Sequence, residues 1–254
     1  MHIMNFPALV FLSSSLILWL TSRIGVYVSR HRRSLESGER EDLNVIITSA
    51  LTLLGLLIGF TFSMATTRYD QRKNYEEEEA NAIGTEYLRV GLLSSADAAK
   101  IQQLLRSYLD LRIGFYQTRT PAQLQQINEQ TSRLQNDLWT AVQTSAQSNP
   151  TPVVALSVSG MNDVINTQGY TQAAWWNRIP VAAWGLMFAI AICCAYLVGY
   201  TAHPVEGKPH RYFILPIIVA VAFLLIADID SPRGGIIRIH PQNLESLAQS
   251  LAPR

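Results

Sequence analysis

Polar side chains recur at helical spacing in residues 43–67, a stretch without any charged residue. At about 100° per residue on an α-helix, they share one face with a single large ring, Phe62, while the opposite face is greasy. The polar face comprises Asn44, Thr48, Gly55, Gly59 and Thr66, with Thr52 and Ser63 at its margin. Hydroxyls and glycine backbone are poorly placed against lipid, so this face should meet other helices or water.

Two interpretations of this polar face are open. The spacing Gly55-x-x-x-Gly59-x-x-x-Ser63 lets helices approach closely, which favours a packing face. Symmetric copies of the helix around an axis would instead line a pore, and Phe62 would form an apolar constriction between wetter segments. A packing face gives less reason for the protruding ring of Phe62, and this ring therefore supports the pore hypothesis.

Charged residues follow this stretch directly, beginning with Arg68 and Arg72 and continuing with the run Glu76–Glu79. Such a run is typical of a solvated helix face, but charges at a pore mouth would also concentrate ions of one sign. The pore-mouth candidates are Arg68, Arg72, Glu76 and Glu79. Because both signs are present, composition does not name the ion.

Two acids, Asp228 and Asp230, close the last apolar stretch. A carboxylate at the membrane edge is costly unless it is paired or hydrated. One interpretation is an ion pair with Arg68 or Arg72, which should emerge on the same side after an even number of crossings. The alternative is a hard-cation site, although two carboxylates supply only part of the roughly six or more oxygens that calcium takes.

The sequence contains no recognisable motif for catalysis, metal binding, redox chemistry or nucleic-acid binding. The five histidines are scattered without metal-ligand spacing, and there is no phosphate-binding loop, His-Glu-x-x-His or Gly-x-Ser-x-Gly. Cys193 and Cys194 are neighbours, a poor arrangement for a mutual disulfide. The net charge of +1 and the lack of a long basic tract argue against nucleic acid as a partner. We expect no catalytic residue, metal or cofactor.

The elements that carry these residues follow from the distribution of charge. Charged residues make up 15% of the chain, against roughly 25% in an ordinary soluble domain. Four stretches contain none, and about 20 apolar residues cross a bilayer as a helix. We therefore expect transmembrane helices at 3–22, 43–67, 179–201 and 212–227, separated by a basic loop (23–42), an extramembrane domain (68–178) and a short loop (202–211), with a tail at 228–254.

The extramembrane region has helical patterns throughout. No Gly or Pro interrupts residues 66–83, so the second span should continue beyond the membrane. Pro121 suits a helix start, and Asn149-Pro150-Thr151-Pro152 predicts a break. An apolar seam runs through Leu124, Ile127, Thr131, Leu134, Leu138, Ala141 and Ser145. It forms either part of the domain core or a site that binds a helix of another protein. The predicted fold class is an all-α integral membrane protein, with two hairpins of transmembrane helices flanking a helical extramembrane domain.

Charge does not settle the side of the membrane on which this domain lies. The two short loops carry seven Lys or Arg residues, and the span flanks on the opposite side carry six. The basic flank of the first helix is C-terminal, which leans toward an outside domain.

Several motifs in order resemble the bestrophin-like domain family of bacterial membrane proteins. They are the run from Gly55 to Met64, Arg68-Tyr69-Asp70, Glu79-Ala80-Asn81-Ala82-Ile83-Gly84-Thr85 and Asp228-Ile229-Asp230-Ser231-Pro232-Arg233-Gly234. The family is distantly related to the bestrophins, pentameric ion channels whose second spanning helix lines a neck narrowed by apolar rings. The resemblance implies that Phe62, with Ile58, forms the constriction. The acidic calcium cluster of animal bestrophins has no clear match beyond Asp228 and Asp230, which argues against calcium gating.

The leading hypothesis is a homo-oligomeric ion channel, pentameric by resemblance, in the bacterial cytoplasmic membrane. Its partners would be the lipid bilayer and permeant inorganic ions. The alternative is a non-conducting membrane sensor or scaffold whose helical domain binds a partner. A transporter is less favoured, because no charged residue lies in the middle of a span.

Overall fold

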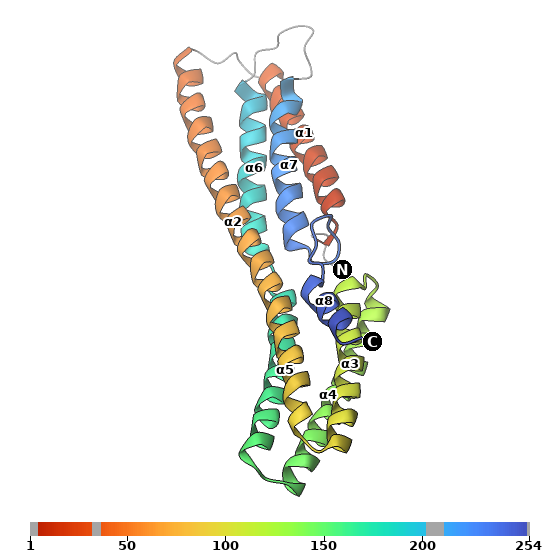
Figure 1. Ribbon diagram of the computed structural model, residues 1–254. Coiled ribbons are helices and arrows are strands. Elements are labelled where there is room, and N and C mark those ends of the chain that lie inside the picture. The colour runs from red at the N-terminus through yellow and green to blue at the C-terminus, as the bar shows by residue number, and fades with distance from the viewer. Residues whose placement is uncertain (1–4, 32–36, 202–210, 253–254) are drawn as a thin grey trace. The chain divides into compact units, whose positions relative to one another are not determined.

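The computed structural model describes residues 5–31, 37–201 and 211–252. Every regular element in those residues is a helix (Figure 1), which confirms the predicted fold class. In chain order they are α1 (Pro7–His31), α2 (Ser37–Arg89), the short 3-10 helix η2 (Val90–Leu92), α3 (Ser95–Gln117), α4 (Pro121–Ser148), α5 (Pro152–Trp176), α6 (Val181–Thr201), α7 (Arg211–Asp230) and α8 (Gln242–Ser250).

Four helical stretches of the described residues are long and apolar enough to cross a membrane. They are Pro7–His31, Gly38–Leu92, Pro152–Thr201 and Phe213–Asp230, and each overlaps one of the four uncharged stretches of the sequence. The chain is thus an integral membrane protein. α2 is one continuous helix of 53 residues, as the absence of Gly and Pro from residues 66–83 predicted.

The structure describes most of the predicted loop 23–42 and only one residue of the predicted loop 202–211. α1 continues to His31 and α2 begins at Ser37, so helix occupies much of the stretch 23–42 that was expected to be a loop. No proline stops α1 in this stretch, and helical hydrogen bonding therefore continues past the apolar segment. The expected loop 202–211 lies outside the described residues apart from Arg211, the first residue of α7.

The first of two compact units comprises Met1–Arg68 and Arg178–Ile237. Within it α1 packs against both α6 and α7. α1 and α6 meet at two glycines: a methyl group on Gly25 would overlap with the backbone at Tyr196, and one on Gly199 with the backbone at Ser22. At the same crossing, Ser22 Oγ donates to the carbonyl of Ala195 at 2.9 Å. Small residues let the two backbones come into direct contact.

The second unit comprises Tyr69–Asn177 and Arg238–Arg254. It is a helical domain in which α3 packs on α4, η2 and α8, and α4 packs on α5. The prolines begin helices as predicted, since α4 starts at Pro121 and α5 at Pro152. The core is assembled from one apolar stripe of each helix, including Ile83, Ile101, Leu105, Tyr108, Phe115, Leu138, Met161, Val164 and Leu244.

The apolar seam of α4 belongs to this core. Thr131, Leu138, Ala141 and Ser145 are buried, and Leu124, Ile127 and Leu134 are partly buried against the same cluster. Of the two interpretations of the seam, the structure supports domain core. The seam is not free to take a foreign helix.

Candidate functional site

The polar face predicted on the second span is turned away from the rest of its own unit. We call it the polar stripe; it comprises Asn44, Thr48, Thr52, Gly55, Gly59, Ser63 and Thr66. All of these residues are exposed except Thr66, which is half-buried. A methyl group added at Gly55 or Gly59 would meet no described atom within 4 Å. The two glycines of the stripe are therefore not used for packing against the part of the chain that the structure describes.

α2 packs within its unit through a different line of side chains. Ile47, Leu54, Thr61 and Ala65 are the buried residues of the apolar part of α2. At about 100° per residue this line lies roughly a third of a turn from the centre of the polar stripe. One chain therefore satisfies one narrow line of α2 and leaves the polar stripe without a partner among the described residues of its unit.

The hydroxyls of the polar stripe are bonded along their own helix. Thr48 Oγ1 donates to the carbonyl of Asn44 and Thr52 Oγ1 to that of Thr48, both at 2.8 Å. Thr66 Oγ1 donates in the same way to Phe62 at 3.1 Å. The hydroxyl proton of each of these three threonines is thus satisfied, while the hydroxyl oxygen remains a polar atom.

The two proposed constriction residues differ in position. The Phe62 side chain is 39% exposed and lies beside the polar stripe. Ile58 is half-buried, and its place in the helical repeat lies between the stripe and the buried line. The Phe62 side chain is therefore more available than that of Ile58 for contacts outside this subunit.

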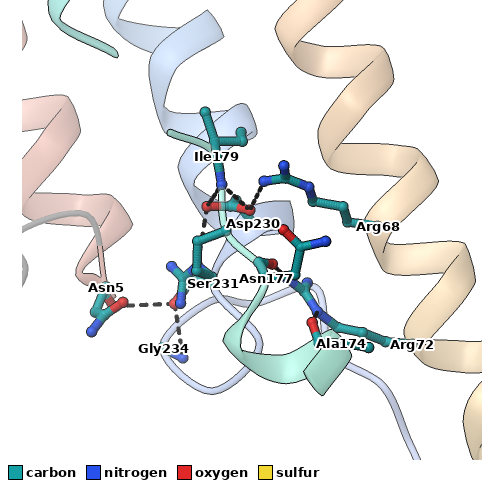
Figure 2. A network of polar contacts seen from close by, with 10 residues as sticks. Asn5, Arg68, Arg72, Ala174, Asn177, Ile179, Asp230, Ser231 and Gly234 are labelled. Carbon is teal, nitrogen blue, oxygen red and sulfur yellow. Dashed lines mark hydrogen bonds and ion pairs between the residues drawn. The ribbon is translucent and has the colours of Figure 1, made fainter. Parts of the chain in front are cut away.

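Asp230, at the end of α7, is the centre of a polar network in the first unit. Figure 2 shows Arg68 of α2 and the backbone of Ile179 both directed at its carboxylate. Arg178 Nε donates to Oδ2 at 3.1 Å, the Ile179 N–H donates to both oxygens at 3.3 Å, and Arg68 Nη1 lies 4.0 Å from Oδ1. The expected pairing of a membrane-edge acid with Arg68 is confirmed, with Arg178 as a second partner that sequence reasoning missed.

Asp228 has a different role, that of an anchor for the chain that follows α7. Its two oxygens accept hydrogen bonds from the backbone N–H groups of Ile236 and Ile237, at 2.7 and 2.8 Å. Ser231 adds to this turn, because its hydroxyl accepts from the Gly234 N–H at 3.2 Å (Figure 2).

The hard-cation alternative is not supported at these two acids. Both carboxylates are occupied by donors from the protein, and a cation would have to replace them. The described residues also contain no cluster of three or more His, Cys, Asp or Glu side chains that could hold a metal ion.

Three of the four pore-mouth candidates are buried in the second unit, which corrects the expectation for them. Arg72, Glu76 and Glu79 are at most 1% exposed. Arg72 donates to the carbonyls of Ala174 and Asn177, at 3.1 and 3.0 Å, and so caps the C-terminal end of α5.

Glu76 caps the N-terminal end of α8, as Arg72 caps the C-terminal end of α5. Its carboxylate accepts from the backbone N–H groups of Asn243 and Leu244, at 2.9 and 3.0 Å, and from the Asn243 side chain at 2.6 Å. A negative charge is favourable at a helix N-terminus, where backbone N–H groups have no intrahelical partner.

Glu79 forms a fully buried ion pair with Arg112 of α3. Tyr116 and Thr171 each donate a hydroxyl to the same carboxylate at 3.3 Å. Burial works against the charge of Arg112, but Glu79 prevails and raises the pKa of the guanidinium. The sequence contained a signal for this pair, since Arg112 interrupts the apolar stripe of α3 at a position that faces the core.

Comparison with known proteins relates the chain to one family and one fold. The family described as "Bestrophin-like domain" matches residues 15–244. No curated protein sequence matches significantly. Among solved structures, a point variant of a bacterial bestrophin homologue from Klebsiella pneumoniae aligns with a TM-score of 0.67 at 13% identity, covering 95% of this chain and 97% of that chain. The homologue solved by Zn-SAD phasing aligns with a TM-score of 0.61 at 15% identity, covering 94% and 95%.

Proposed function

The chain belongs to the bestrophin-like domain family, and on this premise we propose that it is an oligomeric ion channel whose pore is lined by the polar stripe of α2. Family membership supports a function of the ion-channel kind. The pore helix, the lining residues and the number of subunits are our proposal. The similarity to solved bestrophin homologues supports the same fold.

One observation carries the proposal, namely that the polar stripe is left unpacked by the described residues of its own unit. Gly55 and Gly59 meet no side chain, and the polar residues around them are exposed. A lipid-facing helix would gain by replacing such residues with leucine or valine, whereas copies arranged around a wet axis would need them. We propose five subunits on the family resemblance alone.

Phe62 and Ile58 form the proposed constriction. In a symmetric ring each copy contributes one phenyl group at the same height, and a ring of apolar groups in a narrow pore resists wetting and ion passage. Arg68, six residues after Phe62 on α2, is the one pore-mouth candidate that is not fully buried, with a side chain 15% exposed. We propose the surrounding bilayer as a bacterial cytoplasmic membrane, because α-helical spans are typical of that membrane and β-barrels of the outer one.

The function is tested by reconstituting the purified full chain into liposomes and measuring ion flux. We expect flux above that of empty vesicles, across several salts and pH values. Flux no greater than in empty vesicles under all conditions would argue strongly against a channel. It would favour the alternative of a non-conducting sensor or scaffold, although the seam of α4 that suggested such a role belongs to the domain core.

A further inference from the structure

α2 carries three buried glutamates in the helical domain, and one of them differs from the other two. Glu76 and Glu79 each accept at least three hydrogen bonds or ion-pair contacts. Glu86 is equally buried, at 0% exposed. Neither of its carboxyl oxygens forms a hydrogen bond with any group of the described residues.

The contact between α2 and α5 holds Glu86 in this state. Gly160 of α5 lies directly against it, and a methyl group at Gly160 would overlap with Glu86 Oε2. Ser157, one turn earlier on α5, is also fully buried, and its hydroxyl has no hydrogen-bond partner among the described groups. Glu86 on α2 and Ser157 on α5 are therefore two buried polar side chains without hydrogen-bond partners among the described groups.

Two charged side chains act on Glu86, one from each helix. Arg89 of α2 favours the ionised carboxylate, and Asp163 of α5 opposes it. Arg89 is shared between the two carboxylates, because its Nη1 lies 3.8 Å from Asp163 Oδ2 and also lies beside Gly160, next to Glu86 Oε2. No full ion pair therefore compensates a charge on Glu86.

An ionised carboxylate without donors is costly in a buried site, whereas the neutral acid is tolerated. Burial, the largest cause, raises the pKa of Glu86 from 4.5 to about 8. Between these two values the folded domain holds a proton that the unfolded chain has released. The stability of the domain should therefore fall as pH rises through this interval and level off above it.

We propose that Glu86 is a proton-binding site at the contact between α2 and α5, and that α5 packs on α2 only while this carboxyl is neutral. Loss of the proton puts an unpaired charge into the contact, and α5 loosens from α2. The inference concerns the helical domain and does not depend on ion conduction.

Infrared difference spectroscopy of the full chain in detergent, titrated from pH 6 to pH 10, tests proton binding directly. We expect the wild-type protein to show a protonated carboxyl at neutral pH that disappears near pH 8, and the Glu86→Gln variant to lack this signal. Glu78→Gln is the matched control, because Glu78 is an exposed residue of the same helix and should leave the signal intact. A wild-type spectrum without such a carboxyl, or one that survives in Glu86→Gln, would overturn the proposal.

A second variant keeps the test decisive if Glu86→Gln does not fold. The Asp163 side chain is 58% exposed, so Asp163→Asn should be tolerated. Because Asp163 disfavours ionisation of Glu86, its removal should shift the midpoint of the titration to lower pH. An unchanged midpoint would contradict the assignment to Glu86.

Hydrogen exchange tests the structural consequence in the same samples. After correction for the intrinsic effect of pH on exchange, backbone amides of α5 should lose protection above the midpoint in the wild type. Those of α5 in Glu86→Gln should stay protected. Equal protection of wild-type α5 on both sides of the midpoint would show that the proton does not control packing.

Discussion

At the scale of single residues, Phe60 and Phe62 provide a matched pair on one helix. Phe62 lies beside the polar stripe and is 39% exposed, whereas Phe60 lies on the greasy face and is 62% exposed. Both rings are available to surroundings outside the chain, so burial does not distinguish them. Their positions around the helix do, and only Phe62 would point toward a pore lined by the stripe.

We predict that Phe62→Ala raises ion flux in liposomes and that Phe60→Ala does not. If removing the ring lowers the barrier to ion passage by about 1.4 kcal/mol, flux rises about tenfold. The measurement is flux per reconstituted protein for both variants and the wild type. If the protein conducts ions and Phe62→Ala leaves the flux unchanged, the pore lies elsewhere.

The buried pair of Glu79 and Arg112 has a structural role. Its two side chains are fully buried, and Arg112 Cζ lies 4.4 Å from the centre of the Phe115 ring. The hydroxyls of Tyr116 and Thr171 donate further hydrogen bonds to the Glu79 carboxylate. Removing one partner of such a pair leaves an uncompensated buried charge, which costs about 3–5 kcal/mol.

We therefore predict that Glu79→Gln lowers the free energy of unfolding of the helical domain by about 3–5 kcal/mol. Glu78→Gln, at an exposed position, should change it by no more than about 0.5 kcal/mol. Chemical denaturation in detergent, followed by tryptophan fluorescence, measures both variants. Similar values for the two would mean that the Glu79 pair contributes little.

At the scale of elements, the crossing of α1 and α6 brings two helix backbones of the first unit into direct contact. Gly25 and Gly199 allow it, because a side chain at either would occupy the backbone of the other helix. Gly185, on the same helix α6, has open space around it. The same residue type thus serves close packing at two positions and has no packing role at the third.

We predict that Gly25→Ala lowers the stability of the membrane-spanning unit by about 1–3 kcal/mol through overpacking. Gly185→Ala should be neutral or slightly stabilising, since alanine is the better helix former. Thermal unfolding in detergent compares the two variants. Gly25→Ala as stable as Gly185→Ala would show that the helices can separate without cost.

At the scale of the whole molecule, the polar stripe predicts which parts of neighbouring copies meet. Helices that surround an axis bring equivalent residues of the stripe close together, while residues on the greasy face point away from the axis. Assembly can therefore be read from the chemistry of single positions.

We predict that a cysteine at position 59 forms cross-links between copies in membranes. Gly59→Cys, in a chain with Cys193 and Cys194 replaced by alanine, should give cross-linked oligomers with a short bifunctional thiol reagent. Phe60→Cys in the same background should give far fewer, as judged by denaturing gel electrophoresis. Equal cross-linking at both positions would be incompatible with an axis lined by the stripe.

The sequence by itself determined the all-α class, the four spans, the continuation of α2 and the starts of α4 and α5. Each depends on composition or on residues within a few positions of one another: exclusion of charge over about 20 residues, helical periodicity, and proline at helix starts. The polar stripe was readable for the same reason, because a helix places residues of one stretch on one face.

Only the tertiary structure decided which line of α2 packs within the chain and which charges are buried. Glu76 bonds to Asn243, 167 positions away, and Glu79 to Arg112, 33 positions away. Nothing local distinguishes these glutamates from the exposed Glu77 and Glu78 beside them. Nor does anything local mark Glu86, whose isolation arises because Gly160 of another helix covers it. The cost of a buried charge depends on the donors that the fold brings to it, and those donors come from distant parts of the chain.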